Sequence, residues 1–458
     1  MPEFKTTAYQ DLSDFVYAHA KFPVALKNGM VIGGGMLYPE VNFTLPTMTI
    51  ESGTMPEVIR NYKEIITGIC ERAKDLYSPG FVAEIETLPP MTFEPKWGIE
   101  VCRTVVEIAK EYADKHGVRS AVRITPNDIR EGNNLQHMWR GMHWDSMMET
   151  FEGCAGAGAE FLSVESVGGK EVHDEAIMYC DIAKSVFALS VLGCTDMKKL
   201  WTEIAAIADK TGTVPAGDTA CGFANTAMVL ADRNYVPKVF SAAVRVMAAV
   251  RSLVAFECGA KGPHKDCGYE GVYVKAIAGM PIAMEGRTSA CAHLSPVGNV
   301  AMCVADLWSN ESIQNIKLLG GMAPTVSFEQ LEYDCRLMNA ATKRGKEAAL
   351  LLRDLHADSD SALDPQAYVL RPDIVLEISK EIVKEDGYYH RVKKAAALVL
   401  GKIKAAHDSG ELTLDGKELM WLSRLSDDVD ALPADVQTLT EQMLPQCEKL
   451  NPAKYDME

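Results

Sequence analysis

The sequence lacks an excess of basic charge. Its 458 residues include 46 Lys and Arg against 63 Asp and Glu, which gives a formal net charge of −17 at pH 7. Proteins that bind nucleic acid or an anionic membrane surface need a basic face that neutralises phosphates. We therefore expect neither nucleic acid nor a membrane surface among the partners of this chain.

Two features of exported and membrane proteins are also missing. No stretch approaches the roughly 18 charge-free apolar residues of a membrane-spanning helix. The residues after Met1 do not place an apolar core behind a basic segment, as a secretory signal does. Twelve cysteines in 458 residues are too sparse for a disulfide scaffold. We expect a cytoplasmic protein whose thiols are reduced and mostly buried.

The short motifs of common metal and nucleotide sites are absent or incomplete. The sequence contains neither His-Glu-x-x-His nor a Cys-x₂₋₄-Cys pair. Gly33-Gly34-Gly35 is not followed by a helical pattern, so it predicts a turn rather than a phosphate-binding loop. Asp354-Leu355-His356 resembles the beginning of the Asp-x-His-x-x-Gly loop by which corrinoid proteins bind cobalt, but Ser359 replaces the glycine. We expect this chain to hold no corrinoid of its own.

The sequence does contain a repeated alternation of β-like runs and helical spacing. Five β-like runs end in polar or turn residues, at 81–87, 118–125, 159–165, 186–192 and 211–217. Their starts lie 25 to 41 residues apart, which is typical of βα units on a parallel sheet. This rhythm favours a (β/α)₈ TIM barrel with additional helices, and a doubly wound open sheet is the alternative that periodicity leaves open.

The pattern changes near residue 328. Residues 328–355 and 372–407 carry apolar side chains at helical spacing among Glu and Lys, with little β signal. We expect residues 1–327 to form the barrel with an N-terminal extension. Residues 328–458 are expected to form a helical region packed on that barrel.

Reactive side chains of a (β/α)₈ barrel lie where strands end and βα loops begin. This rule selects Glu84, Glu86, Asp128, Glu165, Asp218 and Cys221, together with Glu257, Cys258, His264, Asp266 and Cys267 of a glycine-rich loop. Glu165, Cys221 and one of the last two cysteines come from three separate loops. Two thiolates and one carboxylate suit Zn²⁺ and leave a fourth position open for a substrate. From spacing alone, buried thiols and a solvated glutamate remain the alternative.

Three longer segments resemble a known family. They are Gly-Asp-Thr-Ala-Cys-Gly-Phe-Ala-Asn-Thr at 217–226, Lys-Gly-Pro-His-Lys-Asp-Cys-Gly-Tyr-Glu at 261–270 and Met-Glu-Gly-Arg-Thr-Ser-Ala-Cys-Ala-His at 284–293. These segments, within a similarity that covers the whole chain, are similar to the zinc-containing methanol:corrinoid methyltransferases of methanogens and acetogens. The resemblance implies a (β/α)₈ barrel with added helices.

The resemblance also implies a site and a reaction. Zinc is expected on Glu165, Cys221 and Cys267, with Cys258 as the competing assignment for the last ligand. The implied reaction transfers the methyl group of methanol to the Co(I) of a corrinoid on a partner protein, giving methyl-Co(III) and water. A homodimer assembled with that partner is implied as well. Other possibilities are a different small methyl donor (a methoxylated aromatic or a methylated thiol), a zinc-dependent barrel hydrolase and a non-enzymatic scaffold.

The implied ligand set makes a demand on the rest of the site. Zinc with two thiolates and one carboxylate carries a net negative charge and is a weaker Lewis acid than zinc on three histidines. A further acid or hydrogen-bond donor is therefore expected near the departing oxygen. The sequence offers Asp218, Glu84 and His293 for this role, and we include Asp218 among the expected catalytic residues.

Overall fold

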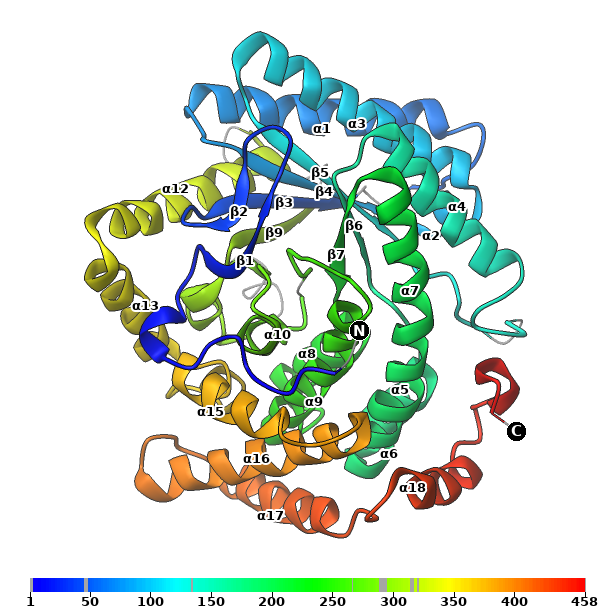
Figure 1. The fold of residues 1–458 in the computed structure, drawn as a ribbon, viewed down its shortest axis with the longest axis vertical. Helices are drawn as coiled ribbons and strands as arrows, with labels where there is room; N and C mark the ends of the chain where they lie inside the picture. Colours follow the sequence, from blue (N-terminus) through cyan, green and yellow to red (C-terminus); the bar gives the residue numbers. More distant parts are fainter. Residues whose placement is uncertain are drawn as a thin grey trace.

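The computed structural model describes residues 3–44, 48–132, 135–265, 267–287, 295–313, 317–318 and 321–457. Its centre is a sheet in which all neighbouring strands are parallel. The strand order is β7 (Val214–Asp218), β6 (Phe161–Val164), β5 (Ser120–Pro126), β4 (Phe81–Thr87), β3 (Tyr38–Thr44), β9 (Leu307–Ile313) and β8 (Ala283–Glu285). Figure 1 shows these strands at the centre of the molecule with helices around them.

Residues 261–264 close this sheet into a barrel. On one side, the amide of Lys261 donates to the carbonyl oxygen of Pro215 in β7 at 2.7 Å. On the other, His264 donates to the carbonyl of Pro281 at 2.9 Å and accepts from the amide of Ala283 at 2.8 Å. The segment thus takes the remaining strand position between β7 and β8. The predicted (β/α)₈ barrel is confirmed.

Amphipathic helices follow the strands and cover the barrel. In α1, for example, Val58, Tyr62, Ile65 and Ile69 recur at helical spacing and are buried. The helices up to the last barrel strand are α1 (Met55–Asp75), α2 (Pro89–Phe93), α3 (Pro95–His116), α4 (Met142–Ala157), α5 (Lys170–Tyr179), α6 (Ile182–Phe187), α7 (Cys194–Thr211), α8 (Thr226–Asp232), α9 (Lys238–Glu257) and α10 (Gly271–Ala278).

Four of the five predicted β-runs correspond to β4, β5, β6 and β7. The prediction of a strand at 186–192 is wrong. Residues 186–192 continue α6 into a π-helix, Ala188–Gly193, that leads into α7. Val186, Phe187 and Leu189 are fully buried there. A short apolar run that is buried on several sides has the same pattern in a strand and in a helix, so periodicity could not separate the two.

A β-hairpin covers the N-terminal end of the barrel. It consists of β1 (His19–Ala25) and β2 (Val31–Gly34), which includes the first two glycines of the Gly33–Gly35 run. Apolar side chains of the hairpin pack against side chains near the beginnings of the barrel strands, among them Val82, Phe161 and Leu307. The opposite, carboxyl end of the strands is therefore the end at which a site can open.

The C-terminal residues form a layer of helices. It contains α12 (Ala323–Arg344), α13 (Lys346–Asp360), α14 (Pro365–Tyr368), α15 (Pro372–Ile382), α16 (Tyr388–Ser409), α17 (Gly416–Asp430) and α18 (Val436–Met443), and two short strands, β10 (Lys317–Leu318) and β11 (Gly321–Met322), precede it. Helix α12 packs against β3 and β9, so the expected boundary at 327/328 falls inside the last barrel helix.

Helix α9 is long and apolar enough, by composition, to cross a membrane. Its mean hydropathy is 1.7, but the whole of this apolar window is buried inside the protein. Helix α16 packs along α9, with α17 and α14 beside them, and Figure 1 shows this layer wrapped around one side of the barrel. The apolar composition of α9 is explained by its position between the barrel and the C-terminal helices.

Candidate functional site

Three expected ligands meet at the carboxyl end of the barrel. Glu165 follows β6, Cys221 follows β7, and Cys267 follows the closing segment 261–264. One carboxylate oxygen and the two sulfur atoms all lie within 4.8 Å of one another. The Cys267 Sγ is 3.7 Å from Glu165 Oε1. Three adjacent strand positions thus bring together side chains that are far apart in the sequence.

The local backbone directs Cys221 into this cluster. Cys221 begins a π-helix, Cys221–Asn225, which continues into α8, and such wide turns occur frequently at functional sites. Asn225 lies one turn later and its Nδ2 donates to Cys221 Sγ at 3.5 Å. Thr219 connects the two cysteine loops, because its Oγ1 accepts from the amide of Cys267 at 3.2 Å.

The buried carboxylate of Glu270 connects the same two loops. Glu270 Oε1 accepts from the amide of Ala220 at 2.7 Å and from Ser252 Oγ at 2.9 Å, and it lies 3.3 Å from His264 Nε2. Burial alone would raise the pKa of Glu270, but His264 and the Ala220 amide outweigh it and lower this pKa to about 2. Glu270 is therefore ionised and fixes the residue that precedes Cys221.

The two thiols are difficult to ionise without a cation. Burial and the neighbouring Cys221 raise the pKa of Cys267 well above its ordinary value. For Cys221, the hydrogen bond with Cys267 lowers the pKa, but burial and the charge of Glu165 outweigh it and leave the pKa raised. A bound divalent cation would offset these effects, because it stabilises thiolates directly. The donor set fits zinc, which prefers sulfur with nitrogen or oxygen.

A buried lysine compensates the carboxylates around this cluster. Lys265 Nζ lies 3.0 Å from Glu84 Oε1, 2.8 Å from Glu86 Oε1 and 3.0 Å from Glu165 Oε1. Glu285, at the end of β8, is 5% exposed, and its Oε2 has no hydrogen-bond partner among the described residues. Burial and the charge of Glu311 raise the pKa of Glu285 well above its ordinary value. The surroundings of Glu285 therefore favour the protonated form of its carboxyl group.

Asp218 is not part of this cluster, and its carboxylate contacts Trp201 and Arg251 instead. Its Oδ2 accepts from Trp201 Nε1 at 3.1 Å, and its Oδ1 lies 3.3 Å from Arg251 Nη1. The side chain is fully buried. Arg251 Nη2 in turn donates to the carbonyl oxygen of Ser166 at 2.8 Å. The structure thus places Asp218 where it braces the residue that follows Glu165.

The other expected residues occupy different positions. Glu84 is paired with Lys265 and also accepts from Thr125 Oγ1 at 2.7 Å, whereas His293 and Asp266 lie outside the described residues. Cys258 caps the end of α9, before the closing segment begins, and its Sγ contacts the carbonyl oxygen of Lys198 at 3.7 Å. Since Cys267 follows that segment, the two cysteines lie at opposite ends of the barrel, and the structure does not bring Cys258 to Glu165.

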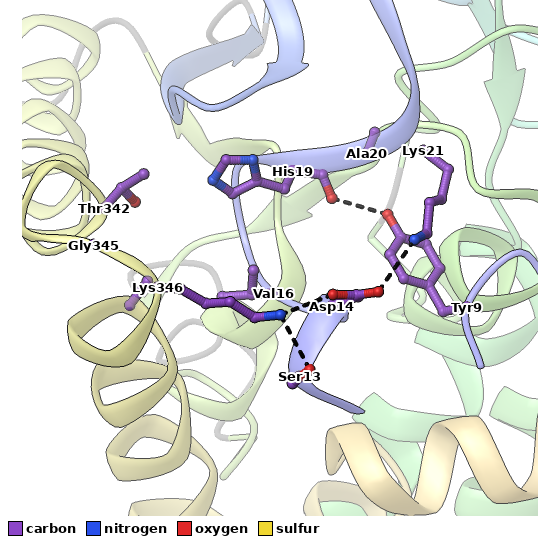
Figure 2. A pocket seen from close by; sticks show the side chains of 11 residues that line it. Tyr9, Ser13, Asp14, Val16, His19, Ala20, Lys21, Thr342, Gly345 and Lys346 are labelled. Carbon is purple, nitrogen blue, oxygen red and sulfur yellow. Dashed lines mark hydrogen bonds and ion pairs between the residues drawn. The ribbon is translucent and has the colours of Figure 1, made fainter. Parts of the chain in front are cut away.

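A pocket of about 400 Å³ opens beside the cluster, and Glu165, Cys221, Asn225 and Lys170 are among its lining residues. A second pocket, of about 450 Å³, lies beside the β1–β2 hairpin at the other end of the barrel. Figure 2 shows that Lys346 and Lys21 both turn to Asp14 there, so this carboxylate is paired with two lysines. The pocket at the carboxyl end, which adjoins the cluster of potential metal ligands, is therefore the candidate functional site.

Sequence reasoning missed several residues of this site. Lys265, Asn225, Thr219 and Glu270 lie inside the segments that resemble the methyltransferase family, but nothing in their spacing indicated their roles. Glu285 was also missed, although it belongs to the third segment. The one available signal for Lys265 was that it is a charged residue two positions before the expected ligand Cys267.

Comparisons with known proteins agree over the full length of the chain. A family model described as the methanol–cobalamin methyltransferase B subunit matches residues 1–456. The chain is 39% identical over 449 residues to the methanol–corrinoid protein co-methyltransferase of Methanosarcina barkeri, covering 96% of this chain and 95% of that protein. It is also similar to a chain in the crystal structure of the methanol:cobalamin methyltransferase complex from Methanosarcina barkeri. That similarity has a TM-score of 0.94 and 36% identity, and it covers 100% of both chains.

Proposed function

The chain belongs to the family of methanol–cobalamin methyltransferase B subunits, and from this premise we propose that it transfers the methyl group of methanol to a corrinoid. The acceptor is the Co(I) of a corrinoid on a partner protein, and the products are methyl-Co(III) corrinoid and, after uptake of a proton, water. The observation that carries this proposal is the convergence of one carboxylate and two thiols within 4.8 Å in the barrel mouth.

Glu165, Cys221 and Cys267 would hold a zinc ion. When bound, zinc would withdraw charge from the methanol oxygen and so make it a better leaving group. Asn225 supports this arrangement, because its amide donates to the Cys221 sulfur and fixes its direction. Lys265 contacts Glu165 through Oε1 and thereby limits the orientations that this carboxylate can take.

The departing oxygen must also receive a proton. Glu285 is suited to supply it, because burial raises the pKa of its carboxyl group and favours the protonated form. Its Oε2 also has no partner within the described parts of the chain. A neutral acid in such a site can donate where an ionised carboxylate cannot. Asp218, in contrast, is engaged with Trp201 and Arg251, and we propose that it acts by positioning the Glu165 loop.

The corrinoid is expected on the partner protein rather than on this chain. His356, part of the incomplete cobalt-binding pattern, lies within α13.

We also propose a homodimer. It is supported by exposed apolar side chains at i and i+4 positions of two adjacent helices, Tyr333 and Leu337 on α12 and Leu351 and Leu355 on α13. A monomeric wild-type chain in sedimentation would contradict the dimer.

A cytoplasmic location is proposed as well. The cysteines that the structure describes are all free thiols, with no disulfide among them, and reduced thiols are typical of that compartment. A membrane surface or nucleic acid is not proposed as a partner, because the net charge of −17 opposes both.

An anaerobic assay tests the reaction. The purified chain is mixed with methanol and cob(I)alamin, and the optical spectrum is followed for methylcobalamin while zinc is measured on the same sample. We expect methylation that requires zinc and stops after chelation. Repeating the assay with the corrinoid partner protein provides the native acceptor. A folded, zinc-free chain that is inactive with both acceptors after zinc addition would refute the proposal.

A further inference from the structure

The C-terminal segment of the chain contacts the loop that carries Glu165. Residues Pro452–Tyr455 form a 3₁₀-helix, and Tyr455 at its end is 3% exposed. The Tyr455 hydroxyl accepts from the amide of Gly169 at 2.8 Å, 286 residues away in the sequence. The same hydroxyl donates to the Glu171 carboxylate at 3.2 Å. One phenol therefore joins the C-terminus to the beginning of α5.

The same segment also holds the loop that follows β5. The Lys454 carbonyl oxygen accepts from the amide of Met138 at 3.1 Å. Asp456 Oδ1 lies 2.8 Å from His137 Nε2. The Tyr455 ring meets the Trp139 ring edge-on at 6.1 Å. Residues 454–456 thus bind both loops that border the candidate metal centre on this side.

The Glu165 loop depends on contacts from outside itself. Gly169 has a φ of 84°, and a Cβ there would lie 2.6 Å from the Ala188 carbonyl oxygen, so only glycine fits. Gly169 caps α5 without a side-chain hydrogen bond, and its buried amide needs an acceptor from elsewhere. Asp128 Oδ2 accepts from the amide of Val167 at 3.0 Å, which joins the two loops directly.

We propose that Tyr455 is a positioning residue for the metal centre. Its hydroxyl fixes Gly169, and the short loop that results holds Glu165 beside Cys221 and Cys267. The function of the C-terminal segment is thus to keep the carboxylate ligand in place from the far end of the chain. The link to metal retention rests on the proposed zinc function, whereas the link to the loop itself does not.

The variant Tyr455→Phe tests this role, because it removes the hydroxyl and keeps the ring. Tyr389→Phe is the matched control, since the Tyr389 hydroxyl donates to the Pro433 carbonyl in the same C-terminal region. Two rates are measured on the full chain: amide hydrogen exchange of residues 165–170, and loss of zinc to a chelator. We expect both rates to rise roughly tenfold in Tyr455→Phe, because a buried amide loses its acceptor. Tyr389→Phe should match the wild type.

Each result bears on the proposal. Unchanged exchange of residues 165–170 in Tyr455→Phe would overturn it. Faster exchange with unchanged zinc loss would also overturn it, since the hydroxyl would then hold the loop without positioning the ligand. A wild-type chain that holds no zinc would defeat the proposed function, and the exchange rates alone would then decide whether Tyr455 fixes the loop.

Discussion

Replacing Lys265 by methionine removes the cation that Glu84, Glu86 and Glu165 share at distances of 2.8 to 3.0 Å. The Lys265 side chain is 5% exposed, so water cannot replace the lost charge. Breaking a buried ion pair by removing one partner costs about 3–5 kcal/mol. Because Glu86 and Glu165 are 22% and 30% exposed, we expect the lower end, about 3 kcal/mol of unfolding free energy.

The cost should depend on pH. In the wild type, burial raises the pKa of Glu86, but Lys265 outweighs it and leaves this pKa below the ordinary 4.5. Ionised Glu86 therefore stabilises the fold above pH 4.5, and this contribution is lost as the pH falls. Without Lys265, only the hydrogen bond from Asn42 opposes the effect of burial, so the pKa of Glu86 rises and the folded variant binds protons that its unfolded chain releases. Lys265→Met should thus lose stability as the pH rises above about 4.5.

Urea unfolding of the zinc-free chains at pH 5 and pH 8 measures this effect. The matched control is Lys261→Met, which changes an exposed lysine in the same segment and should alter stability by less than about 0.5 kcal/mol. The difference between wild type and Lys265→Met should be larger at pH 8. A loss below about 1 kcal/mol that is equal at both pH values would refute the role of Lys265 as the shared counter-ion.

Four further variants test the assigned roles of Cys221, Cys258, Glu285 and Asp218. Cys221→Ser should lose zinc and activity while the far-ultraviolet circular dichroism is retained, whereas Cys258→Ser should keep its zinc; metal analysis showing equal zinc in both would contradict the ligand assignment. Glu285→Gln should lower kcat by about 100-fold or more with zinc content unchanged, since an amide cannot supply a proton; a kcat within twofold of wild type would exclude Glu285 as the acid. Asp218→Asn leaves the buried Arg251 without its counter-ion and should cost about 3 kcal/mol of unfolding free energy, and an unchanged urea midpoint would count against this bracing role.

The sequence determined much of the barrel, because the signals for βα units are local. The runs at 81–87 and 118–125 form β4 and β5, as expected for short β-like segments ended by polar or turn residues. The closing segment 261–264 carried no such signal. Lys-Gly-Pro-His becomes a barrel strand position only because β7 and β8 supply hydrogen bonds on both sides.

For the candidate site too, some residues could be predicted from the sequence and others only from the tertiary structure. The strand-end rule selected Glu165, Cys221 and one of Cys258 and Cys267 in the sequence, and the family resemblance favoured Cys267 with Cys258 as the competing assignment. Only the tertiary structure placed Cys258 at the other end of the barrel, because Cys258 caps α9 and the closing segment 261–264 lies between it and Cys267. The three carboxylates around Lys265 and the hydroxyl of Tyr455 beside Gly169 were also decided by the tertiary structure. Contacts over more than a hundred residues leave no periodic signal, since they arise only when separate strand ends and the C-terminus converge.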